Sequence, residues 1–227
     1  MTKKLVILGG GGHAAVVEAA LRDFPEWEIA AVLDDGRPVG APVIDAKING
    51  PISLLKNMKE QGVEFFHVAV GSCETRLRLF DYALIAGLNP LTVIHKTAFV
   101  DASASVGAGS FVAAGSFIGP RAVVGTGAVI NTHATIDHDC EIGDFAHVCP
   151  GVNLAGAVIV GPLTTIGTGS AVIPLINIGA NAFLGAGSVV VKNIPSSVKA
   201  FGNPCRIIST LPLPDYLPAK KLVEKNR

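Results

Sequence analysis

The chain has 227 residues and no formal net charge, with 16% charged and 49% hydrophobic residues. The balanced charge and the lack of a lysine or arginine block disfavour a nucleic-acid-binding protein, and no apolar run approaches the ~18 residues that a membrane helix needs. The high hydrophobic share instead suggests extensive burial, including contacts between subunits.

The first residues, MTKKLVILGGGGH, hold only four consecutive apolar positions, which is too few for the core of an export signal. We therefore expect a cytoplasmic protein. Its four cysteines show no CxxC pairing and are expected to be reduced thiols: Cys73, Cys140, Cys149 and Cys205.

Residues 1–95 alternate strand and helix patterns. Such alternation is typical of a parallel, Rossmann-like sheet, so we expect a small α/β domain here. Strands are predicted over residues 4–9, 28–35, 64–71 and 91–95, and helices over 13–24, 51–62 and 73–87, with a Gly/Pro-containing loop over 36–50.

Residues 96–195 are an uninterrupted repeat with a period of six. An aliphatic residue occupies every sixth position from Val100 to Val190, and Ile94 fits the start of the series. Small residues dominate two positions before it, and glycine often follows it. The pattern predicts an all-β domain, a parallel β-helix in which three hexads form a triangular coil of 18 residues around inward-pointing aliphatic side chains. The glycines are expected where the chain turns.

Residues 196–227 read as a proline-rich cap and a polar tail. The open ends of a β-helix expose unpaired strand edges. We expect the N-terminal domain to cover one end and this C-terminal segment to cover the other.

The segment GGGGHAA, between the first predicted strand and helix, fits the fingerprint G-x-G-x-x-[GA] from Gly10 to Ala15. Glycines there let backbone N–H groups approach a phosphate at the helix N-terminus. The match leaves three alternatives open: a nucleotide-sugar site, an NAD site, for which the sheet is small, and a turn that binds nothing.

A Gly-loop domain followed by unbroken hexads resembles the NeuD/PglD-like sugar O- or N-acyltransferases of the left-handed β-helix superfamily. The resemblance covers residues 1–208. It rests on GGGGH after the first strand, LDD at the end of the second, VAVG at the end of the third, IDHDCEIGDFAHV in the repeat and FGNPCRII after it. It implies a left-handed β-helix, whose hand the period does not determine. It also implies a homotrimer with acetyl-CoA, the co-substrate, bound between two prisms.

The resemblance further implies that the N-terminal domain binds a nucleotide-linked amino sugar. We expect N-acetylation of a UDP-4-amino-4,6-dideoxy sugar for surface glycan or glycoprotein synthesis. The residues expected to bind the substrate are Gly11, Gly12, His13, Asp34, Asp35 and Gly71. Alternatives stay open for some of these residues. Asp34 and Asp35 also fit an ordinary Asp-Gly turn, His13 also fits a helix start that faces solvent, and Gly71 also fits a plain turn.

An amine that attacks a thioester must lose a proton, and histidine suits the role of base because it titrates near neutral pH. The base of the family falls on His138, and the acid that supports it on Asp139. One coil of 18 residues beyond His138 lies Gly156, which the family uses to stabilise the oxyanion through its backbone N–H.

The resemblance also assigns acetyl-CoA contacts to Gly156, His147, Thr168 and Ala186. Thr168 and Ala186 are 18 residues apart, so the coil length places them in one column. Three cations near the last coils are candidates for contacts with CoA phosphates or simply form a solvated face: Lys192, Lys199 and Arg206.

Other functions stay open. A sugar O-acetyltransferase of the sialic-acid type would use the same site. His133 and His138 have the five-residue spacing of zinc ligands in β-helix carbonic anhydrases, with His95 as a distant third, although we expect no metal and assign His133 no role. A binding protein without catalysis would not need both His138 and Gly156.

Overall fold

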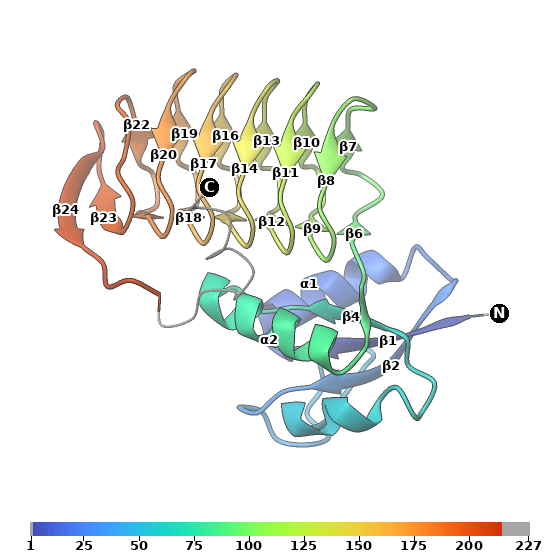
Figure 1. Ribbon diagram of the computed structural model, residues 1–227. Helices are drawn as coiled ribbons and strands as arrows, with labels where there is room; N and C mark the ends of the chain where they lie inside the picture. Colours follow the sequence, from blue (N-terminus) through green and yellow to red (C-terminus); the bar gives the residue numbers. More distant parts are fainter. Residues whose placement is uncertain (1, 215–227) are drawn as a thin grey trace, which may run out of the picture.

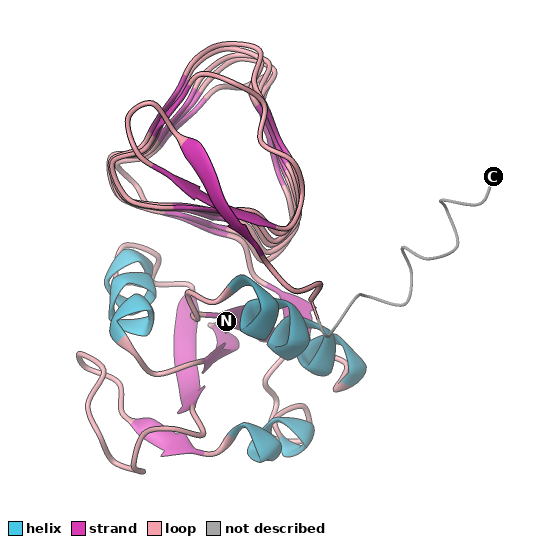
Figure 2. Ribbon diagram, turned by 90° about the vertical axis from the view of Figure 1, so that its left-hand side faces the viewer, coloured by secondary structure: helices cyan, strands magenta, loops and turns pink. Residues whose placement is uncertain are grey.

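The protein, described here from a computed structural model over residues 2–214, has two parts (Figure 1). A five-stranded sheet with helices on both faces forms the N-terminal domain, and a three-sided, left-handed β-helix, or prism, follows it. Figure 2 looks along the prism and shows the N-terminal domain beneath one of its faces. The predicted fold class, α/β followed by all-β, is confirmed.

The N-terminal sheet is parallel, with strand order β3-β2-β1-β4-β5. Helix α1 packs on one face, and α2 with the 3₁₀ helix η1 on the other. Strand β1 therefore lies between β2 and β4, at the switch point where such sheets bind ligands. The elements are β1 (Lys3–Leu8), α1 (Gly12–Leu21), β2 (Trp27–Leu33), β3 (Ile48–Gly50), η1 (Ile52–Asn57), β4 (Phe65–Val68), α2 (Cys73–Ile85) and β5 (Asn89–Pro90).

Three predicted elements of this domain differ from the structure. The helix expected over 51–62 is only the short 3₁₀ helix η1. The Gly/Pro-containing segment 36–50 ends in the short edge strand β3, which pairs with β2. The strand expected over 91–95 does not belong to this sheet: β5 pairs with β4, whereas β6 (Val93–Ile94) pairs with β9 (Phe111–Val112) of the prism. The apolar residues of β6 resemble another strand of the N-terminal sheet because they follow β5 after only two residues.

The prism has three faces, each a stack of short parallel strands. Face 1, which meets the N-terminal domain, contains β6, β9, β12 (Val129–Ile130), β15 (His147–Val148), β18 (Thr165–Ile166) and β21 (Phe183–Leu184). Face 2 contains β7 (Phe99–Val100), β10 (Phe117–Ile118), β13 (Thr135–Ile136), β16 (Asn153–Leu154), β19 (Ala171–Val172) and β22 (Val189–Val190). Face 3 contains β8 (Ser105–Val106), β11 (Val123–Val124), β14 (Glu141–Ile142), β17 (Ile159–Val160) and β20 (Asn177–Ile178).

The predicted coil of 18 residues is confirmed by the strand register, in which Thr135 pairs with Asn153 and Ile136 with Leu154. From Val112 to Val190, every aliphatic residue of the series is at most 3% exposed. The two earlier ones, Val100 and Val106, are only partly buried because they lie in the first coil. Burial of these side chains along one axis holds the coils together.

The glycines that follow the aliphatic residues have a different cause from the expected one. A Cβ at Gly167 would lie 2.5 Å from the backbone nitrogen of Ala186 in the next coil, so the close stacking of coils excludes a side chain there. The residues with a left-handed backbone, at positive φ, lie two positions further along the chain than these glycines. Several of them are not glycine. Examples with φ of 59°, 54° and 60° are Arg121, His133 and Asp139.

The N-terminal domain was expected to cover one open end of the prism, and this expectation is wrong. The domain lies along face 1 instead (Figure 1). Phe111 and Val129 of face 1 are buried against β1 and α1 because their outward side chains supply an apolar surface there.

The C-terminal segment does cover the last coil, where Ile194, Val198 and Cys205 join the prism core. Strand β23 (Val198–Phe201) extends face 1, and β24 (Arg206–Thr210) pairs antiparallel with it. Residues 215–227 of the predicted tail lie outside the described residues. None of the helices within 2–214 has the length and apolar character needed to cross a membrane.

Candidate functional site

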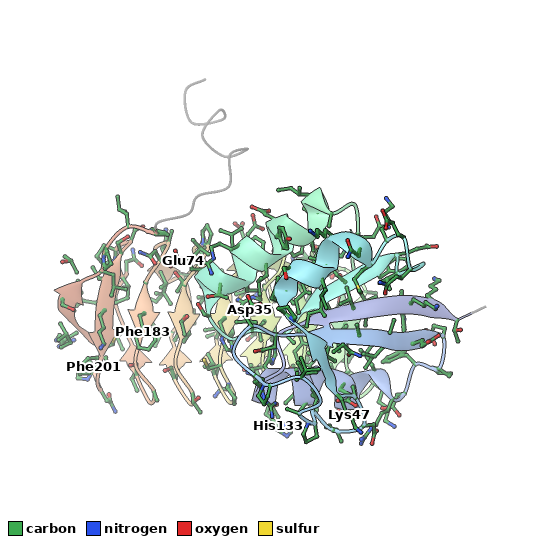
Figure 3. The ribbon with its side chains drawn as sticks, turned by 90° about the horizontal axis from the view of Figure 1, so that it is seen from below. Asp35, Lys47, Glu74, His133, Phe183 and Phe201 are labelled. Carbon is green, nitrogen blue, oxygen red and sulfur yellow. The ribbon has the colours of Figure 1, made fainter. Side chains whose placement is uncertain are left out.

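The predicted substrate residues gather at the carboxyl edge of the N-terminal sheet. The Gly9 N–H donates to Leu33 O and the Ala69 N–H to Leu8 O, which brings the loops after β1, β2 and β4 side by side. In Figure 3, Asp35 and Glu74 lie at the end of this domain nearer the C-terminal coils, which carry Phe183 and Phe201, whereas Lys47 lies toward the opposite end.

Gly11 and Gly12 leave open space at the start of α1. A Cβ at either residue would meet no atom within 4 Å, whereas a Cβ at Gly9 would lie 2.6 Å from Val70 and one at Gly10 would collide with Ile48. No side chain of the described residues caps this helix, so its first N–H groups face the open space. The loop is therefore suited to an anionic ligand that approaches the backbone closely.

The two aspartates behave differently. Asp34 accepts three backbone N–H groups, from Gly10 and from its own turn, at 2.6 to 3.0 Å, and so fixes the shape of the loop. Asp35 accepts one N–H, from Ile52 at 2.8 Å, and its side chain is exposed. Arg37, which the sequence did not point to, donates to the Gly10 carbonyl and is also exposed.

His13 does not face solvent. Its ring packs edge-on against Phe111 at 5.2 Å, and its Nε2 is buried without a hydrogen-bond partner among residues 2–214. Burial, followed by the nearby His67, lowers the pKa of His13 to about 3. His67 of β4 donates from Nδ1 to Leu91 O at 2.9 Å, and burial lowers its pKa to about 4. Both rings are therefore neutral near pH 7.

His147 lies on face 1 and meets the loop after β4. Its Nδ1 donates to Gly71 O at 3.2 Å, and its Nε2 accepts from the Asn131 amide at 3.2 Å. Burial, followed by the charge of Arg76, lowers the pKa of His147 to about 4. The residue predicted to contact acetyl-CoA thus touches one predicted to bind the sugar.

Arg76 of α2 joins the two domains and was missed from the sequence. Its side chain is buried, and burial lowers its pKa. The available signal was its place in the buried stripe of α2, where an arginine needs many acceptors. The guanidinium donates to carbonyls of both domains, those of Val70, Gly71, Gly127, Phe145 and Ala146.

His138 and Asp139 lie on the corner between faces 2 and 3. The His138 Nδ1 donates to Asp139 Oδ2 at 2.7 Å, which leaves the lone pair on Nε2. Arg121, one coil earlier, binds the same carboxylate through Nε at 2.6 Å and Nη2 at 2.8 Å. Arg121, followed by His138, holds the pKa of Asp139 well below its usual range, so the carboxylate stays ionised.

Gly156 stacks on the His138 ring. The Ala157 N–H donates to His138 O at 2.9 Å, and a Cβ at Gly156 would lie 2.5 Å from Cε1 and 2.6 Å from Nε2 of the imidazole. Within the described chain, the Gly156 N–H has no acceptor. A free donor beside an imidazole can bind a carbonyl oxygen at the point where a proton is taken up.

Thr168 and Ala186 lie on a different corner, between faces 1 and 2. They occupy consecutive coils, joined by the bond from Gly187 N–H to Thr168 O at 2.8 Å. Both are exposed, and their own N–H groups have no acceptor within residues 2–214.

The three cations predicted for CoA phosphates do not form one cluster. Lys192 is exposed after the last coil strand, and the Lys199 Nζ lies 5.8 Å from the centroid of the Phe183 ring. Arg206 donates to the Cys205 carbonyl at 2.9 Å.

The histidines of the zinc alternative lie apart. The His133 ring covers Gly115 on the corner between faces 1 and 2, whereas His138 is on the next corner, and His95 bonds to Thr97 at 2.9 Å. In residues 2–214, no three His, Cys, Asp or Glu side chains are grouped so as to hold a metal ion.

The cysteines are free but poorly suited to be nucleophiles. Cys140, next to Asp139 in the chain, donates to Ala155 O at 3.2 Å, and burial raises its pKa. Burial, followed by Cys73, raises the pKa of Cys149 to about 11. Protonated thiols attack weakly.

The site residues thus form two groups in one chain. The carboxyl edge, His147, Thr168 and Ala186 lie at face 1 or at its corner with face 2. His138 and Gly156 lie at the corner opposite face 1. Because the prism has a three-sided cross-section (Figure 2), its body separates the two groups.

Comparisons with known proteins match both domains. The PglD N-terminal domain family matches residues 4–83. GDP-perosamine N-acetyltransferase of Escherichia coli O157:H7 is 30% identical over 155 residues, which cover 66% of this chain and 70% of that protein. Other curated relatives match over a shorter stretch: the Saccharomyces cerevisiae protein YJL218W is 47% identical over 58 residues, and the chain spans only 30% of its length.

Solved structures match nearly the whole chain. PerB from Caulobacter crescentus, in complex with CoA and GDP-perosamine, is 39% identical with a TM-score of 0.87, covering 92% of this chain and 99% of PerB. The acetyltransferase domain of PglB from Neisseria gonorrhoeae, in complex with acetyl coenzyme A, is 32% identical with a TM-score of 0.86, covering 92% of this chain and all of that domain.

Proposed function

The chain belongs to the PglD-like family of nucleotide amino-sugar N-acetyltransferases, and we propose that it transfers the acetyl group of acetyl-CoA to the amine of a nucleotide-linked amino sugar. The observation that carries the proposal is the free Gly156 N–H against the ring of His138, whose Nδ1 is held by Asp139. This pair offers a proton acceptor and an oxyanion donor at one place.

Of the nucleotides, GDP is the first candidate and UDP the second. The relatives from Caulobacter and E. coli are named for GDP-perosamine, whereas the UDP-4-amino-4,6-dideoxy sugar is the expectation from the sequence. Guanine and uracil both have ring N–H groups, and the exposed carboxylate of Asp35 can accept a hydrogen bond from either. The N-acetylated product would serve surface glycan synthesis in the cytoplasm.

The proposed mechanism is direct attack. As the amine nitrogen bonds to the thioester carbon, Nε2 of His138 takes the amine proton, and Asp139 stabilises the imidazolium. The Gly156 N–H binds the oxyanion. The C–S bond then breaks, and His138 returns its proton to the CoA sulfur, which leaves an amide and a free thiol. No cysteine takes part, which agrees with the raised pKa values of Cys140 and Cys149.

We also propose that a second copy of the chain completes the site, within a homotrimer. The Gly loop, His147, Thr168 and Ala186 of one copy would face the His138 corner of the next, because the prism separates these groups within one chain. Phe99 and Phe117 of face 2 stack at 5.1 Å and are 53% and 37% exposed, which suits a subunit contact beside this corner.

A panel of nucleotide sugars tests the function. Purified protein is mixed with acetyl-CoA and with GDP-, UDP- or TDP-linked 4-amino sugars, each paired with the sugar that has a hydroxyl in place of the amine, and thiol release is measured. We expect turnover with amines only, fastest with GDP-perosamine. Turnover with hydroxyl sugars alone would indicate O-acetylation, and none with any sugar would contradict an enzyme of this class.

A further inference from the structure

The Asp139 carboxylate is shared between two side chains. Its Oδ2 accepts from the His138 Nδ1 at 2.7 Å and from Arg121 Nη2 at 2.8 Å, while its Oδ1 accepts from Arg121 Nε at 2.6 Å. The arginine therefore binds both carboxylate oxygens through two parallel hydrogen bonds, the bidentate geometry that is the strongest form of this ion pair. The mechanism above uses His138 and Asp139 but leaves Arg121 without a part.

Arg121 is itself held in place from the coil before it. Its backbone N–H donates to Ser103 Oγ at 3.0 Å, and the Ser103 hydroxyl donates to Asp101 Oδ1 at 2.6 Å. The Asp139 N–H in turn donates to Pro120 O at 3.0 Å. Polar contacts thus run along this corner from Asp101 to His138, and they keep Arg121 and Asp139 in register, one above the other.

We propose that Arg121 is a positioning residue of the transferase: it fixes the Asp139 carboxylate against Nδ1 of His138 and limits how strongly that carboxylate holds a proton on the imidazole. The proposal rests on the proposed function, in which His138 must be neutral before the amine attacks. An acid bound to Nδ1 orients an imidazole and sets its tautomer. Arg121 acts one step further away, through that acid.

The charges around His138 determine the direction of the effect. Asp139 and Asp137 flank it in the chain, and Asp137 Oδ1 accepts the His138 backbone N–H at 2.7 Å. Arg121 is the cation that pairs with Asp139, and Asp101 lies one coil further from the ring. Without Arg121, Asp139 would attract the imidazolium more strongly, so His138 would keep its proton up to a higher pH.

An exposed ion pair often contributes little to stability, and both side chains here are partly exposed, at 65% and 40%. The role proposed for Arg121 is therefore tested by its effect on His138 and not by stability. The conservative replacement Arg121→Lys keeps the positive charge but loses the bidentate hydrogen bonding to Asp139. Arg121→Gln loses both the charge and the bidentate hydrogen bonding.

The test that does not require turnover is an NMR titration of the full-length protein labelled with ¹⁵N-histidine. The His138 signals are assigned by their loss in His138→Ala. We expect the titration midpoint of His138 to move to higher pH in Arg121→Gln and to stay near the wild-type value in Arg121→Lys. The shift should vanish when Arg121→Gln is made in an Asp139→Asn background, because Arg121 acts through that carboxylate.

Arg22→Gln is the matched control, because Arg22 makes an exposed pair with Asp45 through Nε and Nη2 far from this corner. An unchanged His138 midpoint in Arg121→Gln, or an equal shift in Arg22→Gln, would overturn the proposal.

Kinetics supply the second measurement. In Arg121→Gln, kcat should fall about tenfold with little change in either KM, and the acid limb of the pH profile should move to higher pH. Arg121→Lys should recover part of kcat and the position of that limb. If the midpoint shifts but wild-type protein acetylates no amino sugar, the coupling of Arg121 to His138 stands and the proposed function fails.

Discussion

His138 differs from the other histidines by what lies around its ring. His67 is buried and His13 and His147 are largely buried between the domains, and this burial lowers their pKa values to between about 3 and about 4. His138 is exposed, bound at Nδ1 by a carboxylate and covered by Gly156. A base must reach its substrate and release its proton again, and this is the histidine whose surroundings allow both.

Replacement of His138 by alanine should therefore reduce kcat at least ~10²-fold while acetyl-CoA still binds, because the proton acceptor is lost but the CoA contacts remain. Steady-state kinetics and calorimetric titration with acetyl-CoA measure the two effects. His133→Ala is the matched control, since His133 lies on a neighbouring corner of the same prism, and it should leave kcat unchanged. Near-native turnover of His138→Ala would remove this residue from the mechanism.

Gly11 and Gly12 are conspicuous because the fold has room for a side chain at both. Gly12→Val should keep the melting temperature close to that of the wild type and raise the KM for the nucleotide sugar about tenfold or more, because the new methyl groups would occupy the space of the ligand. Gly9→Ala should instead lower the melting temperature, since Gly9 has a φ of 100° and its Cβ would lie 2.8 Å from the Ala69 carbonyl oxygen. An unchanged KM in Gly12→Val would show that the nucleotide binds elsewhere.

At the scale of elements, the hexads predict the prism because each coil repeats one simple requirement. An aliphatic residue every six positions fills the axis, and the strand register confirms the coil length of 18. The same arithmetic links His138 to Gly156, and applied to Asp139 it leads back to Arg121. The coil length therefore places Arg121 beside Asp139, although the sequence does not show that the two side chains bind each other.

Other features depend on contacts between distant segments, which no local pattern records. The strand expected over 91–95 pairs with the prism and not with the N-terminal sheet, because its residues lie where one domain passes into the other. Asp34 resembles a ligand-binding carboxylate in the sequence, but its oxygens bind the backbone of two loops. His13 resembles a helix-start residue that faces solvent, yet the docking of the prism buries it against Phe111.

Arg76 shows how strongly the two domains are joined. Arg76→Leu would leave several buried carbonyls without a donor, each at a cost of roughly 1–3 kcal/mol. We expect a much lower melting temperature, and a calorimetric trace in which the N-terminal domain unfolds before the prism. Arg78→Leu, an exposed position on the same helix, should change neither. A single transition at the wild-type temperature in Arg76→Leu would contradict this account of the interface.

At the scale of the whole molecule, three buried neutral histidines make stability depend on pH. Their pKa values lie below the usual 6.5, so between pH 6.5 and about 4 the unfolded chain binds more protons than the folded one. We expect the contribution of these histidines to the free energy of unfolding to be complete above pH 6.5 and to fall on acidification, by roughly 1.4 kcal/mol per pH unit for each histidine.

Denaturant unfolding at several pH values measures this slope. His67→Leu should lose about one third of it, because one of the three histidines is removed. His133→Ala, which changes an exposed histidine, should keep the full slope. The same slope in His67→Leu as in the wild type would contradict the assignment.

The central claim is that one active site takes its Gly loop from one chain and its His138 from the next. It is tested by co-expression of His138→Ala and Gly12→Val chains in equal amounts, assayed at a nucleotide-sugar concentration well below the KM, where each variant alone should keep only a small fraction of the wild-type activity. In a symmetric trimer, one of the three sites in every mixed assembly would combine two intact halves. Over mixed and unmixed assemblies together this is about a quarter of all sites, so about a quarter of the wild-type activity should return. If the mixed assemblies are as inactive as either parent, the site is not shared between chains.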